Sequence, residues 1–370
     1  MKNKLMLTSA LVGSLVAGSS AIAQTSITGS LDLQYTGLES ATDSNTRNTV
    51  GGSSMEGMGR EAQINIQNKG KTNIAGVDYA AGFALEFDGN GSGTGTEAST
   101  ISNENTYIDF IMGGTTLTFG VDHIQNSHNN LSPTASINMA DILDAQLAVS
   151  YTNSVGANPK ESIGVGIMQA TPFGTFSGLI VPNNGDTGHR DSRITVDQAG
   201  RNSAYEVGFR GNLGVKGLDT KLFYNKENTS GQTPGLPNQL LQDLRGKSAG
   251  IAYNFGAVTV GADRQWNKNV AAPGTTGITS ATATQLGEKK TTQVGVSYAA
   301  SKDLSVSINK SETKRTDIVA TGDEEWMQYA VGYNFGPVAG SISYVTIDNV
   351  GNLASQGDYK IVHARLSTKF

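Results

Sequence analysis

The fold of this chain is constrained above all by an alternation of apolar and polar residues that returns throughout its length. The alternation is clearest in two near-copies of one stretch, GIAYNFGAVTVGADRQ at 250–265 and AVGYNFGPVAGSISYV at 330–345. Successive side chains of a β-strand point to opposite faces, so a period of two indicates strands with one apolar and one polar face. Each copy places Phe-Gly between two such strands, which predicts a β-hairpin written twice.

Counting such segments predicts about sixteen strands. Their expected spans are 25–37, 57–68, 73–88, 100–112, 115–123, 160–171, 174–183, 200–213, 217–228, 245–255, 257–268, 288–299, 302–313, 325–335, 337–348 and 358–370. The joins alternate between short turns, such as Gly113-Gly114, and long stretches rich in Gly, Ser, Thr and Asn. Short turns at one rim and long loops at the other are typical of outer-membrane β-barrels.

The polar face carries too many charged and amide groups to pack as a dry core, because buried unpaired charges are costly. In a transmembrane barrel the apolar face contacts lipid, the polar face lines water, and closure leaves no unpaired edge. We therefore expect an all-β fold, a transmembrane antiparallel β-barrel with short periplasmic turns and long extracellular loops. A soluble secreted or adhesive β-protein is the alternative, and it would be extracted without detergent.

The N-terminus has the pattern of a bacterial secretory signal peptide. Lys2 and Lys4 precede a short apolar stretch, and Ala21-Ile22-Ala23 fits a cleavage site. We expect residues 1–23 to be the signal peptide and residues 24–370 to be the barrel domain of an exported protein. No other window approaches the roughly 18 apolar residues of a spanning helix.

Charge and cysteine content exclude several classes of function. The chain has no cysteine, which excludes disulfides and thiolate sites. Its formal charge of −5 becomes −7 once two signal-peptide lysines are removed (−5 − 2 = −7). A mildly acidic chain is a poor binder of nucleic acid, so none is expected as a partner.

Two stretches carry a resemblance to a known family. The last residues, YKIVHARLSTKF, place Val362, Ala364, Leu366 and Phe370 on one face, and ending on Phe370 resembles the assembly signal of outer-membrane barrels. NTYIDFIMGGTTLTFG at 105–120 looks like a strand pair of the Gram-negative trimeric porins, particularly the proteobacterial, non-enteric type. The resemblance implies a sixteen-stranded barrel, a homotrimer in outer-membrane lipid, and an inward-folded constriction loop, here 123–159.

The resemblance also implies acidic residues on that loop facing basic residues on the barrel wall. The acidic candidates are Asp122, Asp141 and Asp144. The wall candidates are Arg210 and Arg365, with Lys221, Lys247 and His363 as lesser ones. Alternation places four further acids toward the lumen, namely Asp32, Glu86, Asp109 and Glu206. Asp141 and Asp144 could instead face water, and an arginine such as Arg210 could pair with a nearby lumenal carboxylate such as Glu206 for stability alone.

One departure from the family affects the expected ion selectivity. The family commonly has an arginine after the glycine that closes the fifth strand, but here Gly120 is followed by Val121 and Asp122. A weaker basic ladder beside several inward acids predicts a weak preference for cations.

The expected function is passive diffusion of small hydrophilic solutes and ions, without enzyme activity, cofactor or metal. An eighteen-stranded, substrate-specific channel stays open if Leu147–Val155 is a wall strand with a missed partner. An outer-membrane barrel enzyme is the further alternative. It needs a catalytic constellation at the rim, which the four scattered histidines do not offer.

Overall fold

The computed structural model describes residues 24–40, 55–88, 100–121, 163–182, 203–228, 243–271, 286–316, 322–349 and 358–370. These ranges hold sixteen strands: β1 Gln24–Ser40, β2 Met55–Lys71, β3 Asp78–Asp88, β4 Thr100–Met112, β5 Thr115–Gly120, β6 Gly164–Thr171, β7 Gly174–Val181, β8 Ala204–Gly211, β9 Leu218–Glu227, β10 Leu244–Asn254, β11 Val258–Ala271, β12 Leu286–Ala299, β13 Leu304–Arg315, β14 Glu324–Asn334, β15 Val338–Asp348 and β16 Tyr359–Lys369.

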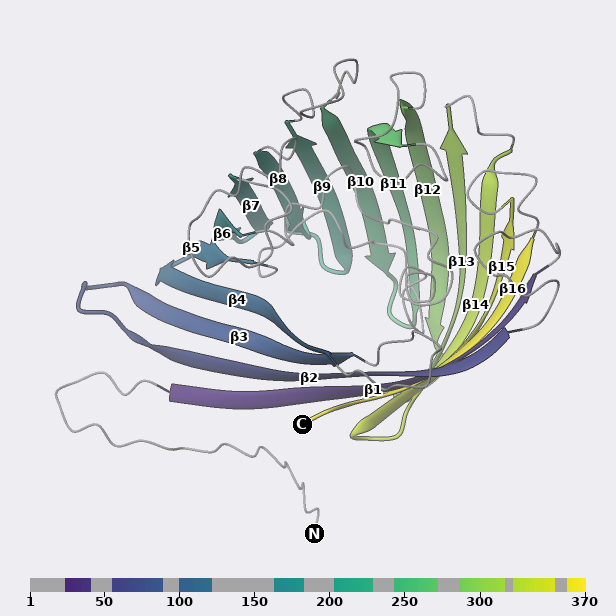
Figure 1. Cartoon of the computed structure of the whole chain (residues 1–370), viewed down its shortest axis with the longest axis horizontal. Helices are drawn as coiled ribbons and strands as arrows, with labels where there is room; N and C mark the ends of the chain where they lie inside the picture. The colour runs from purple at the N-terminus through teal and green to yellow at the C-terminus, as the bar shows by residue number, and fades with distance from the viewer. Residues whose placement is uncertain are drawn as a thin grey trace, which may run out of the picture.

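The strands form one closed antiparallel barrel in which each strand pairs with its neighbours in sequence and β16 pairs with β1. Figure 1 shows the sheet curving from β4 through β13 and returning so that β16 lies along β1. Gly29 and Phe370 extend this seam with two backbone hydrogen bonds of 2.7 and 3.0 Å. The expected fold class is confirmed, because closure pairs the two end strands and leaves no free edge.

One expected strand boundary is wrong by five residues, and the others lie within four residues of the observed ones. We expected a strand over 73–88, but β3 begins at Asp78. Thr72 and Val77 close a turn instead, with the Thr72 hydroxyl donating to the Val77 carbonyl at 2.8 Å and Gly76 at φ 77°. Only Val77 continues the outward parity of Tyr79 and Phe83 into this turn, so the expected strand began too early. Smaller differences occur elsewhere: the fifth strand ends at Gly120 rather than at residue 123, and the sixth begins at Gly164 rather than at residue 160.

Several expectations fall outside the described residues. These are the signal peptide at 1–23, the constriction loop at 123–159 and the segment Leu147–Val155. Within the described ranges, no helix has the length and apolar character needed to span a membrane.

The duplicated hairpin has nearly the same geometry in both copies. The Phe255 amide donates to the Val258 carbonyl at 2.7 Å, and eighty residues later Phe335 donates to Val338 at 2.8 Å (335 − 255 = 80). The glycine after each Phe has a φ of 94° or 98°, a left-handed conformation that favours glycine. Asn254 and Asn334 each accept a hydrogen bond from that glycine's amide at 2.9 Å. Matched sequence therefore yields a matched turn.

The two faces of the barrel differ in composition and exposure. Apolar side chains such as Leu222, Ile251 and Ile342 point outward and are more than half exposed. Polar side chains such as Gln265 and Gln328 point inward and are buried. One inward patch departs from this pattern, because it is apolar and buried near the ends of the strands that long loops join: Leu38, Trp326, Val345, Ile347, Tyr359 and Ile361. Alternation alone did not predict it.

Candidate functional site: the inner wall of the barrel

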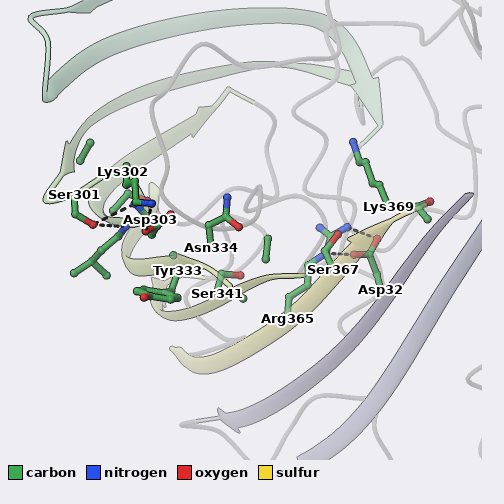
Figure 2. Close-up of a pocket in the computed structure, with 17 residues that line it drawn as sticks. Asp32, Ser301, Lys302, Asp303, Tyr333, Asn334, Ser341, Arg365, Ser367 and Lys369 are labelled. Atoms are coloured by element: carbon green, nitrogen blue, oxygen red, sulfur yellow. Dashed lines mark hydrogen bonds and ion pairs between the residues drawn. The ribbon is translucent and has the colours of Figure 1, made fainter. Parts of the chain in front are cut away.

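Charged residues line the inner wall in clusters, each held on two or three neighbouring strands. We call the end of the barrel with the short turns the short-turn rim and the opposite end the long-loop rim. Figure 2 shows one cluster beside a cavity of about 560 Å³ at the short-turn rim. Asp32, Lys302, Arg365 and Lys369 bring charges to this cavity from β1, the β12–β13 turn and β16.

Arg365 and Asp32 form a two-pronged ion pair across the seam of the barrel. The Arg365 Nε donates to Oδ1 of Asp32 at 3.1 Å and Nη2 donates to Oδ2 at 2.7 Å, as the dashed lines in Figure 2 show. The register places Asp32 opposite Ser367 and Gln34 opposite Arg365, so the pair is diagonal. Both predicted residues thus lie on the inner wall, but their charges largely neutralise each other.

Lys221 forms a second ion pair, which is fully buried. Its Nζ lies 2.7 Å from Oδ2 of Asp263, and both side chains have no exposed surface. The two residues belong to β9 and β11, so the pair crosses over the intervening β10. The residue of β10 in register with both is Gly250, and its lack of a side chain leaves the path open. Lys221 therefore faces inward as predicted, with its charge balanced by Asp263.

Arg210 also faces inward, but its partner is not the one considered from sequence. Its Nη2 lies 2.9 Å from Oδ2 of Asp219, and the two side chains are 33% and 42% exposed. Glu206, the partner considered from sequence, instead accepts a hydrogen bond from Asn225 at 3.2 Å. Diagonal placement explains the difference, because Arg210 is directly opposite Lys221 and reaches the next inward position of β9.

The remaining predicted lumenal acids also lie on the inner wall. Asp109 is buried and accepts a hydrogen bond from the Thr118 hydroxyl at 2.6 Å. Glu86 is buried on the inward face of β3, beside Ala84. Their roles in ion selectivity stay predictions.

The prediction that Lys247 lines the pore is wrong. Lys247 is exposed on the outer wall, where it lies in register with Tyr224 and Trp266. Its neighbour Ser248 is the inward residue and is buried. The outward position could have been predicted from the sequence, because Lys247 and the outward Ile251 are four residues apart on one strand and so lie on the same face. The positive charge favoured a place in the lumen, but the alternation of the strand correctly indicates the outer face.

The loop candidates Asp122, Asp141 and Asp144 lie outside the described residues. Sequence reasoning also missed members of the inner wall. Lys369 shares parity with Arg365 and could have been found in that way, since both line the same cavity. Lys302 and Asp303 belong to a turn, where alternation gives no orientation. Phe370, predicted as an assembly signal, is exposed at the short-turn rim beside the seam.

Chemically, the described part of the inner wall presents paired charges and amides. Among the described residues, no group of three or more His, Asp or Glu side chains is arranged to hold a metal ion. The arrangement suits contact with water and small ions along a polar surface.

Comparison with solved structures gives the same architecture. An anion-selective porin from Comamonas acidovorans matches with a TM-score of 0.63 and 11% identity, over 94% of this chain and all of that one. The outer-membrane channel DcaP of Acinetobacter baumannii matches with a TM-score of 0.62 and 13% identity, over 94% and 97%. OmpF of Salmonella typhi, solved with daunomycin, matches with a TM-score of 0.60 and 11% identity, over 94% and 98%. At such identities the likeness shows the fold.

Comparison of the sequence with models of protein families identifies the family. No curated protein matches the chain significantly. The family model described as Gram-negative porin matches residues 8–352, which is most of the 370 residues. With its closed sixteen-stranded barrel and polar inner wall, the chain belongs to the Gram-negative porin family.

Proposed function

We propose that this protein forms a water-filled channel in a Gram-negative outer membrane and passes small hydrophilic solutes and ions by passive diffusion. The observation that carries the proposal is the closed sixteen-stranded barrel with apolar side chains outside and polar side chains inside. A barrel of about this strand number leaves an aqueous passage rather than a packed interior. Such transport runs down a gradient and requires neither a catalytic group nor a cofactor.

The proposal includes a weak preference for cations. Among the inward strand residues whose side chains the structure describes, carboxylates outnumber basic side chains by two (10 − 8 = 2), so the fixed charge of this part of the wall is slightly negative. Fixed negative charge raises the local concentration of cations. The acids are Asp32, Glu61, Asp78, Glu86, Asp109, Glu206, Asp219, Glu227, Asp263 and Glu324, and the bases are Lys69, Lys71, Arg210, Lys221, Lys289, Arg315, Arg365 and Lys369.

Planar-bilayer recording of the purified protein tests both parts. Insertion should give stepwise, ohmic conductance, and asymmetric potassium chloride should give a reversal potential of the sign for cation preference. The sign of this potential is informative because the similar porin from Comamonas acidovorans is described as anion-selective. An anion-selective reversal potential would refute the preference, and no conductance from folded, inserted protein would refute the channel.

Arg365→Gln should make the channel more cation-selective. The substitution removes the cation that neutralises Asp32 at the cavity of the short-turn rim, and so leaves a carboxylate facing the water path. We expect the reversal potential to shift further toward that of cations. Lys310→Gln is the matched control, since Lys310 is an outward residue paired with Glu325 at 2.8 Å and also loses one positive charge. An equal shift in both variants would show that the inner wall does not set selectivity.

The proposed assembly is a homotrimer with its short-turn rim toward the periplasm. An electrophoretic comparison of unheated and boiled samples should show a trimer that becomes a monomer on boiling. A monomer in mild detergent, at every concentration tested, would refute the trimer while leaving the channel proposal intact.

A further inference from the structure

The outer wall carries a cluster of positive charge near the long-loop rim, on strands β9 to β12. We call it the outer cationic patch. Alternation and register place its members on the lipid-facing side, above the exposed apolar residues Leu222, Ile251, Val260 and Val294 of the same strands. The patch consists of Lys226, Arg245, Lys247, Arg264, Lys268 and Lys290.

Aromatic side chains run through the same rows of the wall. One outward row contains Tyr224, Lys247, Trp266 and Lys290 in direct register. Tyr205 lies next to Tyr224, with ring centroids 6.1 Å apart. Tyrosine and tryptophan on the outside of a barrel gather where hydrocarbon meets the lipid head groups. The row therefore places the cations of the patch at head-group level.

The patch has too few carboxylates to neutralise it. Asp243 lies 2.8 Å from Lys226 and 3.4 Å from Arg245, and Glu288 lies 3.8 Å from Lys268 and 3.4 Å from Lys290. Each carboxylate is thus shared by two cations. Six cations against two carboxylates leave a net charge of +4 (6 − 2 = 4) among these described residues. An excess of this size on a membrane-facing surface calls for an anionic partner.

Two of the cations converge on one aromatic ring. Lys247 Nζ lies 5.2 Å from the centroid of the Trp266 indole, and Arg264 Cζ lies 5.3 Å from it. Within the described ranges neither side chain forms an ion pair with a carboxylate. The two distances limit the separation of the cationic groups to 10.5 Å (5.2 + 5.3 = 10.5), so one lipid head group can contact both. The indole fixes their direction and supplies a flat apolar surface beside them.

We propose that the outer cationic patch binds the phosphorylated head group of an anionic lipid in the outer leaflet, with Lys247 and Arg264 contacting phosphate beside Trp266. The proposal rests on the proposed function only through the placement of the barrel in an outer membrane. Lysine and arginine are suited to phosphate oxygens, and outward residues below the patch offer an apolar track for acyl chains. The partner is thus a membrane lipid rather than a solute of the channel.

The neighbouring strands show that this charge excess is local. On β13 and β14, Lys310 pairs with Glu325 at 2.8 Å, and Lys314 lies 2.6 Å from Glu312 and 3.1 Å from Asp323. Outward cations there have carboxylates of their own and need no external anion. These strands therefore offer a matched control surface on the same barrel.

Binding to detergent-solubilised, folded protein can be measured by native mass spectrometry with diphosphorylated lipid A as the probe. Dephosphorylated lipid A and phosphatidylethanolamine serve as comparison lipids, and inorganic phosphate serves as a competitor. We expect the wild-type protein to prefer the diphosphorylated lipid. The double variant Lys247→Gln/Arg264→Gln should lose roughly tenfold to thirtyfold in affinity, and Lys310→Gln/Lys314→Gln should stay within about twofold of wild type.

Two further arms keep the result decisive. Lys247→Arg should retain binding, because it keeps the positive charge. Rising salt should weaken binding of the phosphorylated lipid to the wild-type protein. Both measurements test the proposal even if the double variant fails to fold. Equal binding of dephosphorylated lipid A, competition by inorganic phosphate in the same concentration range, or undiminished binding by the folded double variant would overturn the proposal. Loss of the oligomer in the double variant, with lipid binding unchanged, would assign the patch to contact between copies and also overturn it. Single-channel conductance should stay unchanged throughout, which separates this proposal from the channel itself.

Discussion

At the scale of single residues, the buried ion pair of Lys221 and Asp263 is where a single substitution should lower the free energy of unfolding strongly. Both side chains are fully buried and lie 2.7 Å apart. Bringing two charges out of water is costly, so such a pair adds little net stability while it is intact. Removing one partner is a different matter, because the other charge stays buried without its counter-ion.

Asp263→Asn should therefore destabilise the barrel by about 3–5 kcal/mol. The double variant Lys221→Met/Asp263→Leu removes both charges and should cost less than Asp263→Asn alone. Urea unfolding of the refolded protein in detergent micelles or lipid vesicles gives the comparison. Arg210→Gln is the control, since its ion pair with Asp219 is well exposed and worth at most about 1 kcal/mol. If Asp263→Asn unfolds at the same urea concentration as wild type, the pair is not buried in the folded protein.

At the scale of elements, the short turns are packed against neighbouring strands, not merely attached to the sheet. At Gly211 of β8 a side chain would meet backbone, because a Cβ there would lie 2.3 Å from Gly174 Cα and 2.3 Å from the Phe173 carbonyl oxygen. The Leu213 amide donates to that same carbonyl at 2.9 Å. The β6–β7 turn and the end of β8 therefore fit together only because glycine occupies the contact.

Gly211→Ala should destabilise the barrel by about 1–3 kcal/mol, because backbone cannot yield to the added methyl group as a flexible side chain can. Gly59→Ala is the matched control. It lies in β2, and a Cβ there would have no atom within 4 Å. The midpoint of the heat-dependent gel shift should fall for Gly211→Ala and stay near wild type for Gly59→Ala. Equal midpoints would show that the β6–β7 turn does not pack on β8.

At the scale of the whole molecule, closure between β1 and β16 joins residues that are far apart in sequence. Leu33 and Leu366 are in direct register on the outer face of the seam, 333 positions apart (366 − 33 = 333). The chain has no cysteine, so an introduced pair can form only one intramolecular disulfide. A cross-link here would close a very long loop in the unfolded chain.

Leu33→Cys/Leu366→Cys should oxidise readily and raise stability by about 3–5 kcal/mol over its reduced form. Thermal or urea unfolding with and without reductant gives the difference. Leu33→Cys/Val338→Cys is the control: Val338 lies on β15, separated from β1 by β16, so this pair should stay reduced within one barrel. Cross-linking in the control but not in the seam pair would contradict the strand order.

The sequence predicted the architecture well because a barrel wall is governed by alternation and by turn chemistry. The hairpins at Phe255 and Phe335 illustrate both, with outward aromatics and glycine at positive φ. Alternation also placed Arg365 and Asp32 correctly. It could not reveal that they neutralise each other, since the pairing is diagonal across a seam between the two ends of the chain.

The contacts and orientations of other inner-wall residues could not be predicted from the alternation of the sequence, for physical reasons. The Lys221–Asp263 pair depends on the missing side chain of Gly250, a contact across three strands that no local pattern reports. Trp326 points inward with its Nε1 donating to Glu324 at 3.0 Å, although an apolar residue was expected to face lipid. Lys247 was misplaced for the opposite reason, because its charge was weighted above its parity.

The twin YNFG turns also bear on how a chain like this can vary. Recombination between their coding sequences would excise or duplicate the eighty residues from one copy to the other (334 − 254 = 80), which is four whole strands, β11 to β14. The product would have twelve or twenty strands (16 − 4 or 16 + 4), with every remaining neighbour still antiparallel and every rim still on its own side. Because the diameter of a barrel grows with its strand number, a single genetic exchange could narrow or widen the channel while the strands stay joined by the same YNFG turn.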